Sequence, residues 1–72
     1  MLTDIERALL DAWKRYPSRR DRRVNAYAEL GLSETRATQI VNALVDRREA
    51  WEAEPLLMGR LARLRASRSR SG

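Results

Sequence analysis

The sequence predicts an all-α protein, a small bundle of about five short helices that contains a helix-turn-helix. Three observations support this class: helix-capping residues recur along the chain, proline and glycine stand where helices should end, and apolar residues follow helical spacing. With 72 residues the chain is long enough for one domain. Its core is therefore small, and its stability depends on every apolar side chain that it buries.

The first helix is expected to begin after Thr3 and to end before Pro17. Thr3 and Glu6 have the spacing of a capping box, in which the hydroxyl and the carboxylate each accept a hydrogen bond from the other residue's backbone amide. Ile5, Leu9 and Trp13 then recur at helical spacing and should face the core. Pro17 ends the helix, because the residue before a proline avoids the helical conformation.

A basic joint, residues 18–23, should lead into a second helix that Ser18 could cap. The apolar residues between 24 and 30 alternate, which leaves a strand open as an alternative. A helix is preferred because alanine, glutamate and leucine favour it. Gly31 then stands at a natural left-handed stop for this helix.

The third helix is expected to begin after Ser33, whose hydroxyl can cap it. Its apolar residues recur three and four positions apart and should face the core: Ala37, Ile40, Val41, Leu44 and Val45. Trp13 and Trp51 should also belong to the core rather than stack on nucleic-acid bases, because the chain has no phenylalanine and few other large side chains.

Two further helices should complete the bundle. Residues 46–49 resemble a second capping box that would open a short fourth helix, and Pro55 suits the first turn of a fifth. The fifth helix has an apolar stripe, which either packs on the other helices or forms the seam of a homodimer: Leu57, Leu61 and Leu64. Residues 1–65 are thus predicted to form a helical domain, and residues 66–72, rich in serine and arginine, a disordered basic tail.

The composition disfavours several classes of function. The chain has no cysteine and no histidine, which removes the thiol nucleophile, the commonest general base and the commonest metal ligands. We therefore expect no enzyme activity, no metal site and no cofactor. No stretch approaches the roughly 18 apolar residues that span a bilayer, and the N-terminus does not resemble a signal peptide. The expected location is the cytoplasm, without a membrane partner.

The charge is unevenly distributed. The net charge is +5, from 15 basic and 10 acidic residues, and 14 of the basic residues are arginine. Residues 1–55 are neutral, whereas residues 56–72 contain five arginines and no acid. Arginine makes forked contacts to phosphate and to guanine that lysine cannot make. An arginine bias also arises in GC-rich genomes. Contacts to nucleic acid and genome composition therefore both stay open as explanations of the arginine content.

Residues 24–45 have the pattern of a helix-turn-helix, in which a glycine turns the chain and a serine caps the second helix. In such motifs the second helix lies in the major groove of DNA. Its outward polar residues are the candidates for base contacts: Thr35, Arg36, Thr38, Gln39 and Asn42. Glutamine and asparagine amides can bond adenine with both a donor and an acceptor. The candidates for phosphate contacts are Arg19, Arg20, Arg22, Arg23, Ser33, Arg65, Arg68 and Arg70.

Four segments in this order carry a resemblance to a known family. They are TDIERALL at residues 3–10, Ser33 with residues 35–36, Gln39 with residues 42–46, and residues 54–57 leading into RLARLR at 60–65. Together they resemble a family of small helix-turn-helix-like proteins of unknown function from actinobacteria and their phages. The chain departs from that pattern at residues 37–38, where relatives tend to have aromatic residues, and at residue 48, where a proline is common.

The leading hypothesis is a small sequence-specific DNA-binding protein, a transcriptional regulator that reads the major groove of double-stranded DNA with the helix at residues 33–45. A protein-interaction module that docks on a host protein such as RNA polymerase is the alternative from a different class. A third hypothesis is an accessory protein of DNA recombination or packaging, which would use DNA contacts of the same kind.

Overall fold

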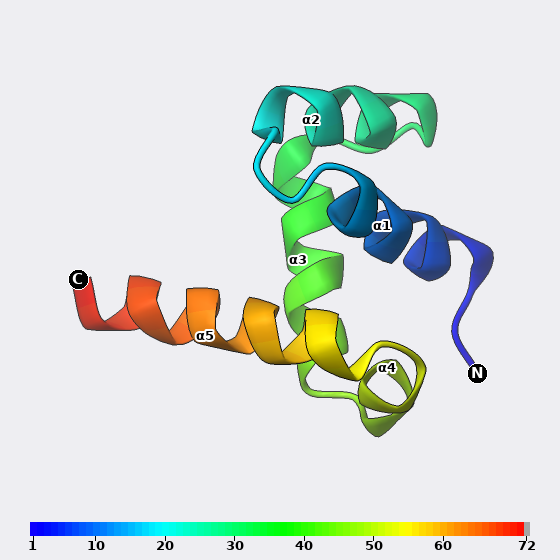
Figure 1. Cartoon of the computed structure of the whole chain (residues 1–72). Helices are drawn as coiled ribbons and strands as arrows, with labels where there is room; N and C mark the ends of the chain where they lie inside the picture. The colour runs from blue at the N-terminus through cyan, green and yellow to red at the C-terminus, as the bar shows by residue number, and fades with distance from the viewer. Residues whose placement is uncertain (72) are drawn as a thin grey trace.

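The computed structural model describes the backbone of residues 1–71 and the side chains of residues 1–67, and within this part the chain forms five helices (Figure 1). In chain order they are α1 (Asp4–Arg15), α2 (Arg20–Glu29), α3 (Glu34–Val45), α4 (Arg48–Ala53) and α5 (Pro55–Ser71). No strand occurs in residues 1–71. The all-α class is therefore confirmed, and the strand alternative for residues 24–30 is wrong.

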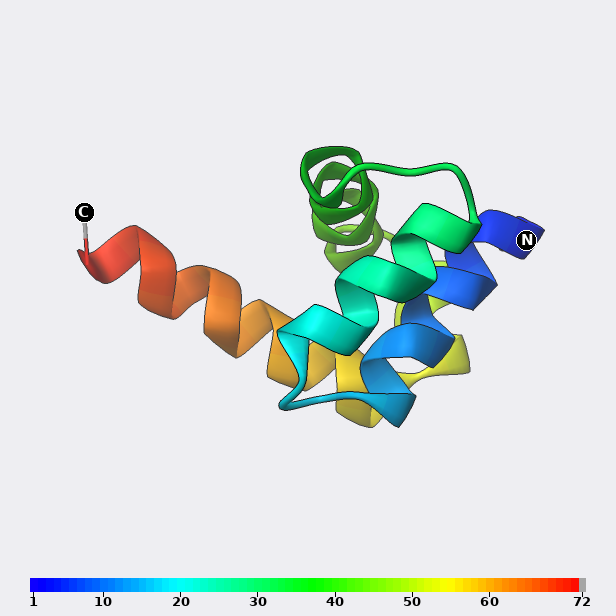
Figure 2. The same cartoon turned by 90° about the horizontal axis from the view of Figure 1, so that it is seen from above.

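Helix α3 lies at the centre of the arrangement and contacts each of the other four helices. In Figure 1 it runs between α2 at the top and α4 and α5 at the bottom, with α1 packed alongside. The second half of α5 projects away from the bundle, which is clearest in the view from above (Figure 2). One side of α3 therefore faces the core, and the other side borders the open angle that α5 makes with the bundle.

Helix α1 has the boundaries that the sequence predicts. The Thr3 amide donates to the Glu6 carboxylate at 2.8 Å, and the Glu6 amide donates to the Thr3 hydroxyl at 3.1 Å. Both halves of the capping box are thus present. The helix ends at Arg15, and Tyr16 follows as its C-cap directly before Pro17.

The turn between α2 and α3 is also as predicted. Gly31 has a φ of 77°, and its amide donates to the Ala28 carbonyl at 2.9 Å. The next amide, that of Leu32, donates to the Tyr27 carbonyl at 2.9 Å. This pair of bonds is a Schellman motif, which satisfies carbonyls at the end of α2. The Ser33 hydroxyl then caps α3 by accepting from the amide three residues further on.

Two predicted caps are wrong. The N-cap of α2 is Arg19, which makes no side-chain capping bond, so Ser18 does not cap this helix. The N-cap of α4 is Arg47, also without a side-chain cap, and Asp46 is instead the C-cap of α3. The Asp46 carboxylate is bound by Arg65 of α5, 19 residues away, and so does not cap α4. A partner this distant in sequence outweighed the local capping pattern.

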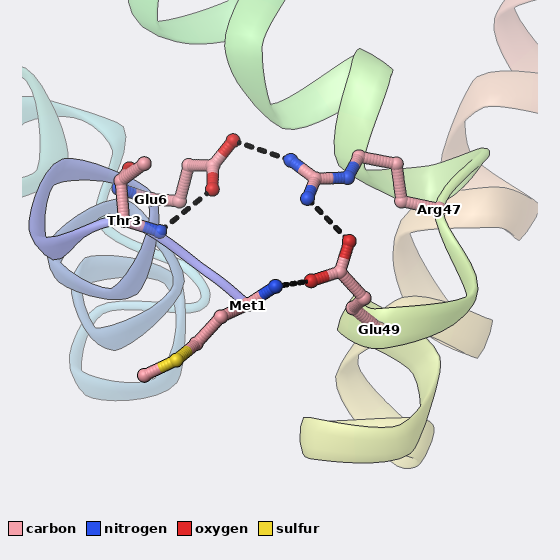
Figure 3. A network of polar contacts seen from close by, with 5 residues as sticks. All are labelled: Met1, Thr3, Glu6, Arg47 and Glu49. Atoms are coloured by element: carbon pink, nitrogen blue, oxygen red, sulfur yellow. Dashed lines mark hydrogen bonds and ion pairs between the residues drawn. The ribbon is translucent and has the colours of Figure 1, made fainter.

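Arginine and carboxylate side chains also join the start of α1 to the start of α4 (Figure 3). Arg47 donates to the Glu6 carboxylate at 2.8 Å and also to Glu49. Glu49 accepts in addition from the amino group of Met1. The hydrogen bond from this amino group and that from Arg47 lower the pKa of Glu49. Glu49 is therefore part of a tertiary network rather than of a capping box.

The buried residues form one core cluster to which every helix contributes. The α3 members are the predicted Ala37, Val41, Leu44 and Val45. Ile40 is half-buried at the edge of this cluster. Leu57 and Leu61 of the α5 stripe are buried as well, together with Met58, which the sequence analysis had not singled out.

Trp51 is not a core residue, which corrects the prediction. Its side chain is 38% exposed, and its indole N–H donates to the Val45 carbonyl at 2.7 Å. That bond places the ring at the edge of the short helix α4, and the small neighbour Ala50 takes the fully buried position. Trp13 is half-buried against the core, whereas Ile5 is 43% exposed and does not belong to it.

The α5 stripe packs within the chain. Leu57 and Leu61 are buried in the protein's own core, and Leu64 is 43% exposed. The first two leucines are therefore unavailable as a dimer seam, while dimerisation itself stays a prediction. The predicted tail, residues 66–72, falls largely outside the residues whose side chains are described. The backbone of α5 is helical to Ser71, and the division of the chain at residue 66 stays a prediction.

Truncation of Leu44 should unfold much of the population. Leu44 is fully buried at the centre of the core, and Leu44→Ala should lower the free energy of unfolding by about 2–5 kcal/mol. Leu56, which is 90% exposed, provides the matched control. Leu56→Ala deletes the same atoms, but from a side chain that faces solvent and not the core. Urea denaturation followed by circular dichroism measures both. Equal midpoints for the two variants would contradict the packing of α3.

Two glycine substitutions should have opposite effects on stability. Gly31→Ala should destabilise by about 1 kcal/mol, because an alanine pays for the positive φ although no atom lies within 4 Å of its Cβ. Gly59→Ala should stabilise by about 0.5–1 kcal/mol, because glycine is unfavourable inside a helix and the new Cβ would meet only the Trp51 ring at 3.9 Å. Thermal melting of both variants tests this, and shifts of the same sign would contradict it.

Candidate nucleic-acid interface

The outward face of α3 is polar. Thr35, Arg36, Gln39 and Asn42 are exposed, and Thr38 is half-buried beside them. Helical periodicity places them opposite the α3 residues that enter the core. The structure thus gathers the five residues predicted to contact bases on the side of α3 that the core leaves uncovered.

A groove of about 560 Å³ runs between α2, α3 and α5. We call it the α3 groove. From α3 it is lined by four of the five predicted base-contact residues, Thr35, Thr38, Gln39 and Asn42, whereas Arg36 does not line it. Arginines border it from both neighbouring helices: Arg20 and Arg23 of α2, and Arg65 of α5. Its apolar part comes from residues for which the sequence predicted no contact with DNA: Trp13, Tyr27, Val41, Leu61 and Leu64.

The two ends of α3 carry arginine–carboxylate pairs. At the N-terminal end, Arg20 donates through Nε and Nη2 to the two Glu34 oxygens, each at 2.5 Å. At the other end, Arg65 donates to the two Asp46 oxygens at 3.1 and 3.2 Å and to the Asn42 carbonyl at 3.4 Å. The hydrogen bonds to Glu34 and the attraction to its charge raise the pKa of Arg20. The hydrogen bonds from Arg65 and the attraction to its charge lower the pKa of Asp46. Arg20, Arg65 and Asp46 therefore stay charged at neutral pH.

Arg23 is engaged inside the protein. Its guanidinium lies 3.8 Å from the centre of the Trp13 ring, a cation–π contact. It also donates to the Tyr16 carbonyl at 2.6 Å and to the Pro17 carbonyl at 3.1 Å. These contacts join α2 to the end of α1, so the side chain that was predicted to contact phosphate holds the joint between two helices.

The remaining predicted phosphate contacts have different surroundings. Arg19 donates to the Asp21 carboxylate at 3.1 and 3.2 Å, which lowers the pKa of Asp21. The Ser33 hydroxyl accepts the capping bond of α3. Arg22 is exposed and makes no ion pair or hydrogen bond through its side chain within residues 1–67. The side chains of Arg68 and Arg70 lie outside the described residues.

Sequence reasoning missed the carboxylate partners of Arg20 and Arg65, because each partner is far from its arginine in the sequence. Arg20 and Glu34 are 14 residues apart, and Arg65 and Asp46 are 19 apart. No local spacing rule covers such distances. The only available signal was an excess of arginine near the third helix together with two acids at its ends.

Two further properties of the described residues bear on function. Across residues 1–71 none of the helices combines the length and the apolar character that crossing a bilayer requires. No group of three or more aspartate, glutamate, histidine or cysteine residues in the described part of the chain is placed to hold a metal ion.

Fold and site together define a small all-α protein whose central helix presents a polar face beside an arginine-bordered groove. The model of the family described as "Protein of unknown function (DUF3263)" matches residues 1–71, and the chain belongs to this family. No curated protein and no solved structure matches the chain. Membership supports the part of the resemblance that concerns a family of unknown function, while its range of organisms and its helix-turn-helix character stay predictions.

Arg23 should contribute to stability, unlike its neighbour Arg22. Arg23→Ala removes the contact with Trp13 and two charged hydrogen bonds, so the free energy of unfolding should fall by about 1–3 kcal/mol. Arg22→Ala removes a charge of the same sign from the same helix and should change it by less than about 0.5 kcal/mol. Urea denaturation measures both. If the two variants were equally stable, the joint between α1 and α2 would not depend on Arg23.

Proposed function

We propose that this protein binds double-stranded DNA in a sequence-specific manner and regulates transcription, with α2 and α3 acting as a helix-turn-helix and α3 in the major groove. One observation carries the proposal. The side chains of Thr35, Arg36, Gln39 and Asn42 make no hydrogen bond or ion pair within residues 1–67, although they share the outward face of the central helix. Hydrogen-bonding groups that are held in place without internal partners are suited to reading base edges.

The chemistry of these side chains matches the donors and acceptors of the major groove. Gln39 and Asn42 are three residues apart on one helix face, and each amide can bond adenine through its donor and its acceptor. Arg36 can bond guanine through two donors, and Thr35 can contact phosphate or a thymine methyl group. A helix with side chains is about 10–12 Å across, and the major groove is about 12 Å wide.

Phosphate contacts would come from arginines around α3. Arg22 has no internal partner among the described side chains, and Arg20 and Arg65 border the α3 groove. Arg68 and Arg70 belong to residues 56–72, which contain no acid, and we include them in the proposal on charge alone. Such contacts supply affinity for any sequence, whereas the α3 face supplies discrimination.

Removing the two amides should weaken binding to the correct site selectively. A preferred duplex is first obtained by selection from a random library, and binding is then measured by fluorescence anisotropy. Gln39→Ala and Asn42→Ala should each cost about 1–3 kcal/mol on the selected duplex and little on a random one. Asn25→Ala provides the control, since Asn25 is an exposed amide on α2 that does not line the α3 groove.

Two results would contradict the proposal. The first is that no duplex binds above background at low salt. The second is that the Gln39 and Asn42 variants lose no more affinity for the selected duplex than the Asn25 variant does. A recombination or packaging accessory would pass both tests, and a promoter-reporter assay in cells separates regulation from these roles.

A protein-interaction module is the second candidate, and a different surface supports it. Leu56 is 90% exposed and Trp51 is 38% exposed, close together in sequence at the junction of α4 and α5. A second groove of about 810 Å³ lies between α1 and α4 and includes Leu2 and Leu10 among its lining residues. Exposed apolar side chains mark protein contacts where they form a contiguous patch. If DNA binding fails, this end of the bundle becomes the better supported site, with RNA polymerase or another host protein as the partner.

A further inference from the structure

The acids at the two ends of α3 have a role in the proposed DNA site. We infer that Glu34 and Asp46 are specificity-determining residues, which pair with Arg20 and Arg65 and thereby lower the affinity for DNA of arbitrary sequence. This inference rests on the proposed function. It assigns to two acidic residues a function that net charge alone would not suggest, since acids beside a DNA-binding face repel the phosphate backbone.

The placement of the pairs supports this role. Glu34 is the first residue of α3 and Asp46 directly follows its last, so the two pairs are separated by about 18 Å along the helix axis. Arg20, Glu34 and Arg65 line the α3 groove together with four of the five predicted base-contact residues. Phosphates on the two strands flank the major groove, so a helix lying in it would bring both pairs near the DNA backbone.

The geometry of the pairs resembles an arginine–phosphate contact. Both arginines donate through two nitrogens to two carboxylate oxygens, and guanidinium groups bind phosphate with the same fork. The pairs are open to solvent, since the side chain of Arg20 is 73% exposed and that of Arg65 is 41% exposed. Ion pairs this exposed contribute little to stability, so a phosphate can replace the carboxylate.

Pairing of the two arginines with carboxylates affects specific and non-specific DNA binding differently. Non-specific binding consists almost entirely of phosphate contacts, so it loses most when two arginines are neutralised. A specific complex also has base contacts from the α3 face, which fix the helix in one register and hold phosphates where they can replace both carboxylates, whereas a non-specific complex leaves the carboxylates paired. The acids therefore weaken the wrong complexes more than the right one, which raises discrimination at a cost in affinity.

The test removes the carboxylate charges while keeping their shape. Glu34→Gln, Asp46→Asn and the double variant are compared with the wild type on the selected duplex and on a random duplex, over a series of salt concentrations. Each freed arginine should steepen the log–log salt dependence by about 0.9, and the double variant by nearly 2. Affinity for the random duplex should rise in each variant, and the ratio of specific to random affinity should fall.

Glu52→Gln is the matched control. It removes the same charge from an exposed glutamate of α4 that lines the other groove, so it reports the effect of net charge alone. Circular dichroism confirms that each variant is folded. Equal effects of Glu52→Gln and Glu34→Gln would overturn the inference, and so would weaker random binding in the Glu34 and Asp46 variants.

The same data separate this inference from the proposed function. A wild type that prefers its selected duplex, combined with unchanged salt slopes in the variants, overturns the inference and leaves the DNA proposal standing. Absence of binding in the wild type and in every variant overturns both. A double variant that binds random duplex where the wild type binds weakly is the result that we expect.

Discussion

Burial of one face of α3 is the interaction on which the rest of the structure depends. Ala37, Val41 and Leu44 lie in the core, and α3 contacts all four other helices. A chain of 72 residues has few apolar side chains with which to offset the loss of conformational entropy. Packing all the other helices against one central helix lets these few apolar side chains stabilise the whole bundle. It also holds the opposite face of that helix in a defined position. The candidate site is therefore a direct consequence of the core.

Features encoded by neighbouring residues were predictable from the sequence. The capping box at Thr3, the stop at Gly31 and the cap at Ser33 all depend on residues within a few positions of one another. The features that the sequence did not predict depend on tertiary partners. Asp46 is bound by an arginine of α5 instead of capping α4, and Trp51 lies at the surface because its indole bonds a backbone carbonyl of α3.

The arginines illustrate the same limit within the candidate site. An outward-facing position can be read from helical periodicity, so Gln39 and Asn42 were predictable as a polar face. Whether an arginine is available to a ligand depends on what else it touches. Arg23 contacts an aromatic ring that is ten residues away in another helix, while its neighbour Arg22 has no partner among the described side chains. Two arginines in adjacent positions therefore have different roles, which composition and spacing do not reveal.

The distribution of charge then gives a physical reason for the acids near a face proposed to bind DNA. A basic protein binds any duplex, and every unpaired arginine strengthens that binding without regard to sequence. Discrimination requires that part of this attraction be withheld until base contacts have formed. Carboxylates that pair with arginine through the same fork as a phosphate provide such a restraint, because the exchange preserves the hydrogen bonds of the guanidinium. Glu34 and Asp46 stand at the two ends of α3, where the DNA backbone would lie, and this is the position at which that exchange is most effective.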